Sequence, residues 1–175
     1  MTDVSPAADR LQCLAPILDA DTRLIVLGSF PGVASLRAQR YYAHPHNQFW
    51  KILGALWGLP LHDMPYQEKT DILRARGLGV WDVYAACERE GSLDRAIEHA
   101  ELNDLASLST RCLQLQAIAH NGGESHKHAR HTRALGLPVY RLPSTSPANA
   151  SWNLARKLDA WRAVFARHGL AAEVA

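Results

Sequence analysis

The chain has 175 residues, of which 47% are hydrophobic, so it can bury one substantial core and we expect a single globular domain over residues 1–175. A formal net charge of +2 neither requires nor excludes a nucleic acid partner, because binding to a polyanion depends on a local basic face. No apolar run reaches the length of about 18 residues that a membrane-spanning helix needs, so we expect no membrane partner.

The cysteines and the first residues bear on the compartment. Cys13, Cys87 and Cys112 lie far apart, which argues against a disulfide scaffold, a cysteine-ligated zinc site or an iron–sulfur cluster. The segment from Met1 to Arg10 lacks the basic start and the apolar stretch of an export signal. We therefore expect a cytoplasmic protein with reduced thiols.

Taken in order, the chain alternates between helix-like and strand-like patterns. The first segment, Asp9 to Leu18, has apolar residues at helical spacing around Pro16 and is predicted to form a helix. Leu24 to Leu27 is a short apolar run that ends at Gly28, which is typical of a buried strand. The spacing of apolar residues then predicts a helix over Phe49 to Trp57.

The later segments continue this alternation. They are a helix at 65–76, a strand at 79–84 running into a polar segment at 87–92, a helix from a cap at Asn103 to Cys112, a strand at 115–120, a basic helix at 124–135, a strand at 139–142, and a closing helix at 151–168 with Leu154, Leu158, Trp161 and Phe165 inward. Alternating strands and helices predict a mostly parallel sheet with helices on both faces. In such a sheet, ligands bind in the crevice at the carboxyl ends of the strands.

Three loops follow predicted strands and are expected to meet at this crevice. They span residues 28–47, 120–128 and 143–149. In the last loop, a Ser-Thr-Ser turn between Pro143 and Pro147 is rigid and rich in hydroxyl groups, which suits it to bind phosphate. By itself this tripeptide is more often a capped turn, in which Ser146 or Asn149 begins the closing helix.

Four motifs together resemble the uracil-DNA glycosylase superfamily, and within it most of all the hypoxanthine (deoxyinosine) DNA glycosylases. They are Gly28-Ser29-Phe30-Pro31-Gly32, Tyr42-Ala43-His44-Pro45-His46-Asn47-Gln48-Phe49-Trp50, Asn121-Gly122 and Leu142-Pro143-Ser144-Thr145-Ser146-Pro147, and they follow the family's order within a core of about residues 23–168. The resemblance implies a three-layer α/β/α domain with a central four-stranded, mostly parallel sheet. It also implies an enzyme that flips a deaminated base, hypoxanthine above others, out of DNA and hydrolyses its N-glycosidic bond, leaving an abasic site. Such an enzyme is expected to act as a monomer with no metal and no cofactor.

For the base, the resemblance implies a pocket made by the first three motifs. Tyr42 matches the aromatic residue on which the extruded base stacks. Asn121 matches a position next to the third strand, and its amide can donate to O6 and accept from N1–H of hypoxanthine, groups that adenine reverses. Gly28, Ser29 and Phe30 complete the expected base-binding set. In isolation, the segment that begins at Asn121 is more often a simple turn.

On the DNA side, the Ser144-Thr145-Ser146-Pro147 segment matches the loop that enters the minor groove. Ser146 stands where the mismatch-specific relatives use Leu, so we expect a weak wedge, stiffened by Pro147. Three further residues are expected to contact DNA: Ser35, His44 and Lys127. His44 could equally be a surface histidine that makes no contact with the substrate.

The catalytic residue is expected in the second motif. Mismatch-specific relatives carry an Asn third in the first motif, where this chain has Phe30, which cannot orient water. The deoxyinosine branch shares this feature, and Asn47 matches its catalytic Asn, whose carbonyl oxygen would hold the attacking water. Asn47 could instead cap the helix that begins near Gln48. Loss of the first-motif Asn puts uracil excision in doubt, so a uracil or G:U/T mismatch glycosylase is the alternative within the family.

Two hypotheses from other classes rest on different features. The first is a metallohydrolase whose metal is held by a histidine cluster. Its members would be His120, His126, His128 and His131. Basic residues around this cluster repel a cation and favour a helix that faces phosphate. The second hypothesis is a protein that binds DNA damage without cutting it.

Overall fold

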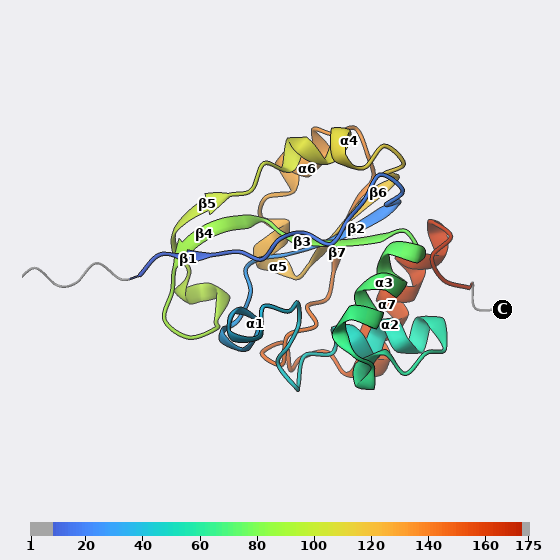
Figure 1. The fold of residues 1–175 in the computed structure, drawn as a ribbon, viewed down its shortest axis with the longest axis horizontal. Helices are drawn as coiled ribbons and strands as arrows, with labels where there is room; N and C mark the ends of the chain where they lie inside the picture. The colour runs from blue at the N-terminus through green and yellow to red at the C-terminus, as the bar shows by residue number, and fades with distance from the viewer. Residues whose placement is uncertain (1–8, 173–175) are drawn as a thin grey trace, which may run out of the picture.

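The computed structural model describes residues 9–172, and a four-stranded sheet forms its centre (Figure 1). The strands are β2 (Leu24–Gly28), β3 (Leu78–Asp82), β6 (Ala117–Asn121) and β7 (Val139–Leu142). They lie in the order β3-β2-β6-β7, and each neighbouring pair is parallel. All four carboxyl ends therefore lie at one edge of the sheet, which confirms the predicted sheet.

Helices cover both faces of this sheet, so the domain has three layers. Side chains of β2 alternate between two cores, because successive residues of a strand point to opposite faces. One core lies under α2 (Phe49–Trp57), α3 (Tyr66–Ala75) and α7 (Leu154–Arg167). The other lies under the 3-10 turn η3 (Leu105–Ser107) and α4 (Leu108–Arg111), with α6 (Ala129–Arg133) beside them. Figure 1 shows the two groups on opposite sides of the strands.

The longer helices follow the sequence pattern closely. α2 has the predicted bounds and ends at Gly58, whose φ of +65° lies in the left-handed region that favours glycine. α7 starts later than predicted, after Asn153, whose side chain accepts a hydrogen bond of 2.8 Å from the backbone N–H of Arg156. Neither Ser146 nor Asn149 begins this helix. Leu154 was expected to point inward but is 40% exposed, because it occupies the first position of α7.

A second, antiparallel sheet was not predicted. It consists of β1 (Leu11–Gln12), β4 (Tyr84–Glu88) and β5 (Glu98–Leu102). The predicted helix over residues 9–18 is therefore wrong, since β1 pairs with β4 and Ile17 bridges Val80 at the edge of the parallel sheet. Pro16 cannot donate to a helical hydrogen bond, and the extended segment uses the edges of both sheets for its backbone bonds instead.

Three other boundaries differ from the prediction. The strand expected over 79–84 ends at Asp82, and Val83 donates to the carbonyl of Gly28 as the chain turns into the second sheet. Asn103 caps no helix, because its amide donates to the carbonyl of Asp82 at 2.8 Å. The basic helix expected over 124–135 is two short ones, α5 (Gly123–His126) and α6, with His128 between them. The remaining elements are α1 (Val33–Ala38), η1 (Leu61–Asp63) and η2 (Asp94–Ala96).

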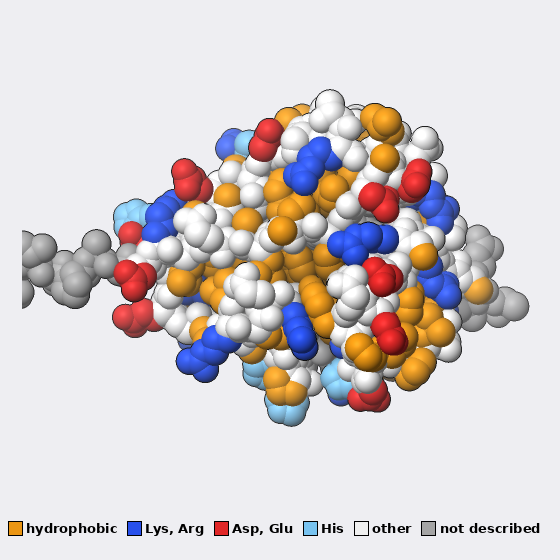
Figure 2. Space-filling model, in the orientation of Figure 1, with side chains coloured by type: hydrophobic (Ala, Val, Ile, Leu, Met, Phe, Trp, Pro, Cys, Tyr) orange, Lys and Arg blue, Asp and Glu red, His pale blue; other side chains and the backbone are white. Residues whose placement is uncertain are grey.

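Charged side chains of both signs are spread over the face shown in Figure 2, and histidines gather along its lower edge in the region of α1 and α2. Within residues 9–172, none of the helices is both long and apolar enough to cross a membrane.

Candidate active site

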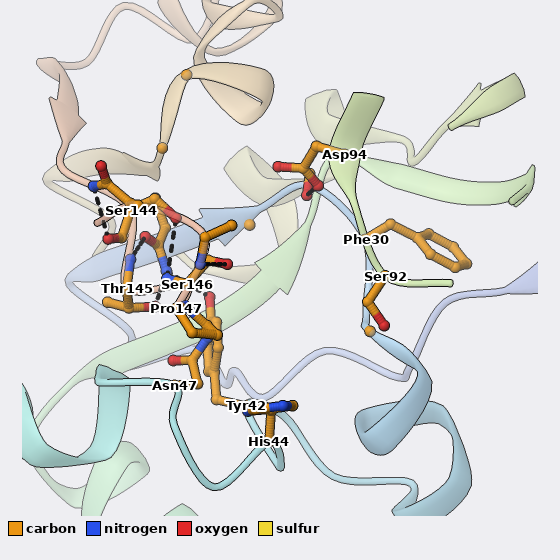
Figure 3. Close-up of a pocket in the computed structure, with 18 of the residues that line it drawn as sticks. Phe30, Tyr42, His44, Asn47, Ser92, Asp94, Ser144, Thr145, Ser146 and Pro147 are labelled. Atoms are coloured by element: carbon orange, nitrogen blue, oxygen red, sulfur yellow. Dashed lines mark hydrogen bonds between the residues drawn. The ribbon is translucent and has the colours of Figure 1, made fainter. Parts of the chain in front are cut away.

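A cavity of about 1190 Å³ opens at the carboxyl edge of the parallel sheet. Each strand contributes its last residue to the lining: Gly28, Asp82, Asn121 and Leu142. The predicted site residues that line it are Gly28, Ser29, Phe30, Ser35, Tyr42, His44, Asn47, Asn121, Ser144, Thr145, Ser146 and Pro147. The topology thus brings together loops that are more than a hundred residues apart in the chain, and Figure 3 shows several of these side chains around the hollow.

Tyr42 forms part of the cavity wall in a conformation that its neighbours impose. Its φ of +53° is in the left-handed region, which is strained for a residue with a side chain. Its ring stacks on the buried ring of Phe49 with 4.0 Å between centroids. Its hydroxyl accepts a hydrogen bond of 3.1 Å from the Asn121 amide. Tyr42 is therefore a fixed flat surface on the cavity, as a stacking platform requires, and its contact with a base stays a prediction.

Asn121 is held by the protein at three points. Its Nδ2 donates to Tyr42 Oη at 3.1 Å and to Thr145 Oγ1 at 3.0 Å, and its Oδ1 accepts from the backbone N–H of Thr145 at 3.1 Å. Both amide hydrogens are engaged, whereas Oδ1 keeps a second lone pair. Asn121 can therefore accept a hydrogen bond from a base. The sequence predicted that the amide would also donate one, but it cannot do so unless one of these bonds breaks.

Asp82 is a cavity residue that sequence analysis missed. Its side chain is buried, and its Oδ2 has no hydrogen-bond partner within residues 9–172. Burial and, to a lesser extent, the nearby Asp94 carboxylate raise the pKa of this carboxyl to about 7, although Arg89 opposes the shift. A Cβ at Gly28 would lie 2.5 Å from Asp82 Oδ1 and 3.2 Å from Tyr42 Oη. Only glycine therefore lets the carboxyl and the phenol approach β2 so closely.

The signal for Asp82 was present in the sequence. An acidic residue directly after Gly79-Val80-Trp81 interrupts an apolar strand pattern, and such a residue is seldom buried without a functional reason. The strand was expected to continue to Tyr84, so Asp82 was placed inside it. The structure ends β3 at Asp82, which puts this side chain at the edge where ligands bind.

We expect Asp82 to make stability depend on pH. Its pKa of about 7 in the folded protein lies above the ordinary value of 3.8, so the folded state keeps a proton that the unfolded chain loses. The free energy of unfolding should therefore fall as the pH rises from about 4 to 7, by up to about 4 kcal/mol at 1.36 kcal/mol per pKa unit. Asp82→Asn should remove this decline, which denaturant titration of both proteins across that range measures. If the free energy of unfolding changed with pH in the same way for both proteins, the Asp82 carboxyl would not be buried as described.

Asn47 lies just before α2 and also lines the cavity. Its Oδ1 accepts a hydrogen bond of 3.0 Å from the backbone N–H of Phe49, the first residue of the helix. The N-cap of α2 is Gln48, so Asn47 supports the start of the helix from one position before the cap. A carbonyl oxygen has two lone pairs, so the same atom can accept a second hydrogen bond from a water in the cavity. The catalytic role of Asn47 stays a prediction that this geometry permits.

The loop at residues 143–149 is braced from within. Ser144 Oγ accepts from the Ser146 backbone N–H at 3.1 Å, and Ser146 Oγ accepts from that of Ala148 at 3.2 Å. Thr145 is fully buried, and its carbonyl accepts a hydrogen bond of 3.0 Å from the Gln48 backbone N–H. Thr145 thus fastens the loop to the start of α2, while Pro147 lies exposed at the rim (Figure 3).

The first loop presents its backbone more than its side chains. Ser29 Oγ donates to Asp94 Oδ1 at 2.6 Å, which ties the loop to η2. Phe30 is 7% exposed and packs under the Arg89 guanidinium, 5.3 Å from its ring centroid. Figure 3 shows the Phe30 ring directed away from Tyr42 and Asn47. Phe30 therefore belongs to the second core, and any contact with a base would come from the backbone beside it.

The three further residues expected to contact DNA have different surroundings. Ser35 is buried, and its hydroxyl accepts a hydrogen bond of 3.1 Å from the Ala43 backbone N–H. His44 is exposed at the cavity rim. Lys127 is exposed, pairs with Glu124 at 2.6 Å and does not line the cavity. The structure brings Ser35 and His44 to the site but not Lys127, and their contacts with DNA stay predictions.

The histidines of the proposed metal cluster make other contacts. His120 is fully buried between Ser125 Oγ at 2.7 Å and Thr132 Oγ1 at 2.9 Å, and burial lowers its pKa to about 4. His128 lies 2.8 Å from the hydroxyl of Tyr84. In the part of the chain that the structure describes, no three His, Cys, Asp or Glu side chains are grouped so that they could hold a metal ion.

Taken together, the parallel sheet with helices on both faces and a cavity at its carboxyl edge defines a three-layer α/β protein with a built ligand site. The model of the family described as "Uracil DNA glycosylase superfamily" matches residues 15–165. The chain therefore belongs to the uracil DNA glycosylase superfamily, as its motifs predicted.

Its relatives agree with this assignment. A hypoxanthine DNA glycosylase of Methanosarcina acetivorans is 38% identical over 152 residues, which cover 87% of this chain and 95% of the relative. A hypoxanthine DNA glycosylase of Methanosarcina barkeri is 35% identical over 156 residues, which cover 89% of this chain and 98% of the relative. A solution NMR structure from Methanosarcina acetivorans, described as a candidate uracil DNA glycosylase, has a TM-score of 0.83 and 35% identity and covers 92% of this chain and 99% of its own. The predicted fold class and the class of enzyme, a DNA glycosylase, are confirmed.

Proposed function

We propose that this chain excises hypoxanthine from DNA by hydrolysing the N-glycosidic bond, which leaves an abasic site. The observation that carries the proposal is the cavity in which the flat ring of Tyr42, the buried carboxyl of Asp82 and the Asn121 amide oxygen meet. The names of the relatives, hypoxanthine DNA glycosylases, support this substrate. A base can enter such a cavity only after its nucleotide has left the stack.

Hydrogen-bond polarity selects the base. Hypoxanthine presents an acceptor at O6 and a donor at N1–H. Neutral Asp82 donates to O6, and the free lone pair of Asn121 Oδ1 accepts from N1–H. Adenine reverses both groups and leaves two buried partners unpaired, which costs about 1–3 kcal/mol for each group. Guanine shares this edge, so its exclusion depends on a lack of room or of an acceptor for its 2-amino group.

The chemistry is a displacement at C1′ of the sugar. A water held by Asn47 Oδ1 forms the new C–O bond while the bond between C1′ and N9 breaks. The electron pair of the broken bond passes to the base. The water loses its proton to solvent or to the departing base. Negative charge gathers on O6 as the base leaves, where the hydroxyl of neutral Asp82 stabilises it. An ionised Asp82 would repel the same charge.

Excess protein incubated with labelled oligonucleotides that carry hypoxanthine, xanthine or uracil, followed by alkali, tests the proposal. We expect strand scission at hypoxanthine and none in undamaged DNA, with or without a chelator. Preferential scission at uracil would support the mismatch-specific alternative. Binding without scission would support a damage-binding protein, and loss of activity in chelator would support the metallohydrolase.

Stacking on Tyr42 can be tested separately. Tyr42→Ala should weaken binding to a duplex with a slowly cleaved 2′-fluoro deoxyinosine by about 1–3 kcal/mol, the range for one base on an aromatic ring. Tyr42→Phe is the matched control, because it keeps the ring and removes only the hydroxyl that accepts from Asn121. Titrations monitored by fluorescence anisotropy give both affinities. An equal loss on undamaged DNA would rule out stacking of the flipped base.

We further propose that the protein acts as a monomer on DNA in a reducing cytoplasm. Cys13, Cys87 and Cys112 are all free thiols, which fits that compartment. Light scattering at assay concentration measures the oligomeric state, and a stable dimer would contradict this part of the proposal.

A further inference from the structure

A second, smaller hollow lies beside the candidate active site. This basic cleft, of about 310 Å³, is lined by His46, Gln48, Lys51, Ser146, Pro147, Asn149, Ala150, Trp152 and Lys157. Four of these residues also line the active-site cavity: Ser146, Pro147, Asn149 and Trp152. The two hollows therefore share the 143–149 loop as their common wall.

Lys157 is the unusual member of the basic cleft. It belongs to α7, yet it is only 2% exposed. No ion pair involves it within residues 9–172, and burial alone lowers the pKa of its ammonium group, with no neighbouring charge contributing. An ammonium group buried without an anion is costly, so its usual place is beside a carboxylate or a bound anion. Lys157 lines the cleft, so an anion bound there would lie against this side chain.

A second lysine, Lys51, adds positive charge to the cleft. Lys51 is exposed on α2 and His46 is exposed in the loop before it. Among residues 9–172, no carboxylate lines the cleft. The buried amide oxygen of Gln48 accepts no hydrogen bond from this part of the chain, but a neutral amide cannot balance the charge of Lys157. The charge and size of the cleft therefore suit a small anion.

We propose that the basic cleft binds one backbone phosphodiester of the DNA strand that carries the lesion, between Lys157 and Lys51. The location follows from the shared loop: a strand whose nucleotide enters the cavity passes over Ser146 and Pro147, so an adjacent phosphate reaches the cleft. This inference rests on the proposed function for the identity of the DNA strand. The cleft holds the strand against the 143–149 loop both before a base enters the cavity and while one occupies it.

Lys157→Met tests the cleft, since methionine keeps an unbranched apolar stem and removes the charge. For binding to a lesion-free duplex, the slope of log Kd against log salt should decrease by about 0.9, the value for one phosphate. Lys51→Met should give the same decrease, and the double variant should lose no more than either single one, because both hold one phosphate. Lys69→Met is the matched control: Lys69 is also largely buried but donates to the carbonyl of His62 and lines neither hollow, so its slope should not change.

A second measurement identifies the phosphate. Neutral methylphosphonates can replace the phosphates around a slowly cleaved deoxyinosine one at a time. At one flanking position, this replacement should weaken DNA binding by the wild type. At the same position, it should not weaken DNA binding by Lys157→Met any further. Equal losses for both proteins at every position, or an unchanged salt slope, would overturn the proposal. The melting temperature of Lys157→Met should be unchanged or higher, whereas a structural lysine would lower it. Because lesion-free DNA reports on the cleft, failure to excise hypoxanthine would contradict the proposed function without affecting this test.

Discussion

Replacing Asn47 with alanine is expected to slow hypoxanthine excision by about 100-fold or more and to leave DNA affinity nearly intact. The reason is geometric: Asn47 lines the cavity, and in the proposed mechanism it holds the attacking water, whose misplacement costs about two orders of magnitude in rate. Its side chain carries no charge that would bind phosphate. Single-turnover kinetics with excess enzyme measure the chemical step directly. An unchanged rate would remove Asn47 from the mechanism.

The hydrogen bond that Asn47 accepts at the start of α2 requires its own control. Asn47→Ala also removes the acceptor for the Phe49 N–H, which should cost about 1 kcal/mol of stability. Asn47→Ser retains a short side-chain acceptor, so it should recover most of that stability while its excision stays slow. Recovery of both stability and excision by the serine variant would show that Asn47 acts only through the helix start.

Excision by the wild type is expected to decline by about tenfold for each pH unit above about 7, because in the proposed mechanism only neutral Asp82 donates to O6 of the base. Burial sets this threshold near neutrality, far above the range of an exposed carboxyl. Asp82→Asn carries an amide that donates at any pH, so its profile should be flat over this range. Single-turnover rates from about pH 5 to 9 compare the two enzymes.

Two outcomes would assign Asp82 a different role. A wild-type rate that rises with pH through about 7 would mean that the ionised carboxylate is the active form, as for a base that activates water. Identical profiles for wild type and Asp82→Asn would mean that Asp82 titrates without touching the reaction. Asp94→Asn serves as a control, because it removes the neighbouring charge that raises the pKa of Asp82 and should shift the decline to lower pH.

Elements with a strong apolar period could be predicted from the sequence. α2 has its predicted bounds, and the strand starting at Leu24 lies inside the sheet as a buried strand. Both could be predicted because consecutive residues in the sequence show which side chains are buried. β5 could not be found in this way. Its residues are all exposed, so no face of it is apolar, and it exists only because β4 offers an edge to pair with. The same pairing opportunity draws β1 away from the expected helix.

Some residues of the candidate site could likewise be predicted from the sequence, and others could not. Tyr42, Asn47 and Ser144 could be predicted because they lie in loops after predicted strands and match motifs of the family, and the structure places all three on one cavity. Asp82 was missed because the sequence predicted one strand over residues 79–84, which placed Asp82 inside a strand, whereas β3 ends at this residue. Lys157 could not have been suspected, since a lysine on an amphipathic helix normally extends into solvent. Its burial depends on how α7 packs in the tertiary structure.

By itself, the sequence determined the family, the parallel sheet and the loops that carry the chemistry, because motif order and apolar periodicity are local properties of the chain. Only the tertiary structure decided which groups in those loops are free to act. It engages both amide hydrogens of Asn121 and leaves Asp82 Oδ2 without a partner. The physical reason is that hydrogen bonding and desolvation depend on neighbours distant in sequence, and these neighbours set the charge and availability of each group.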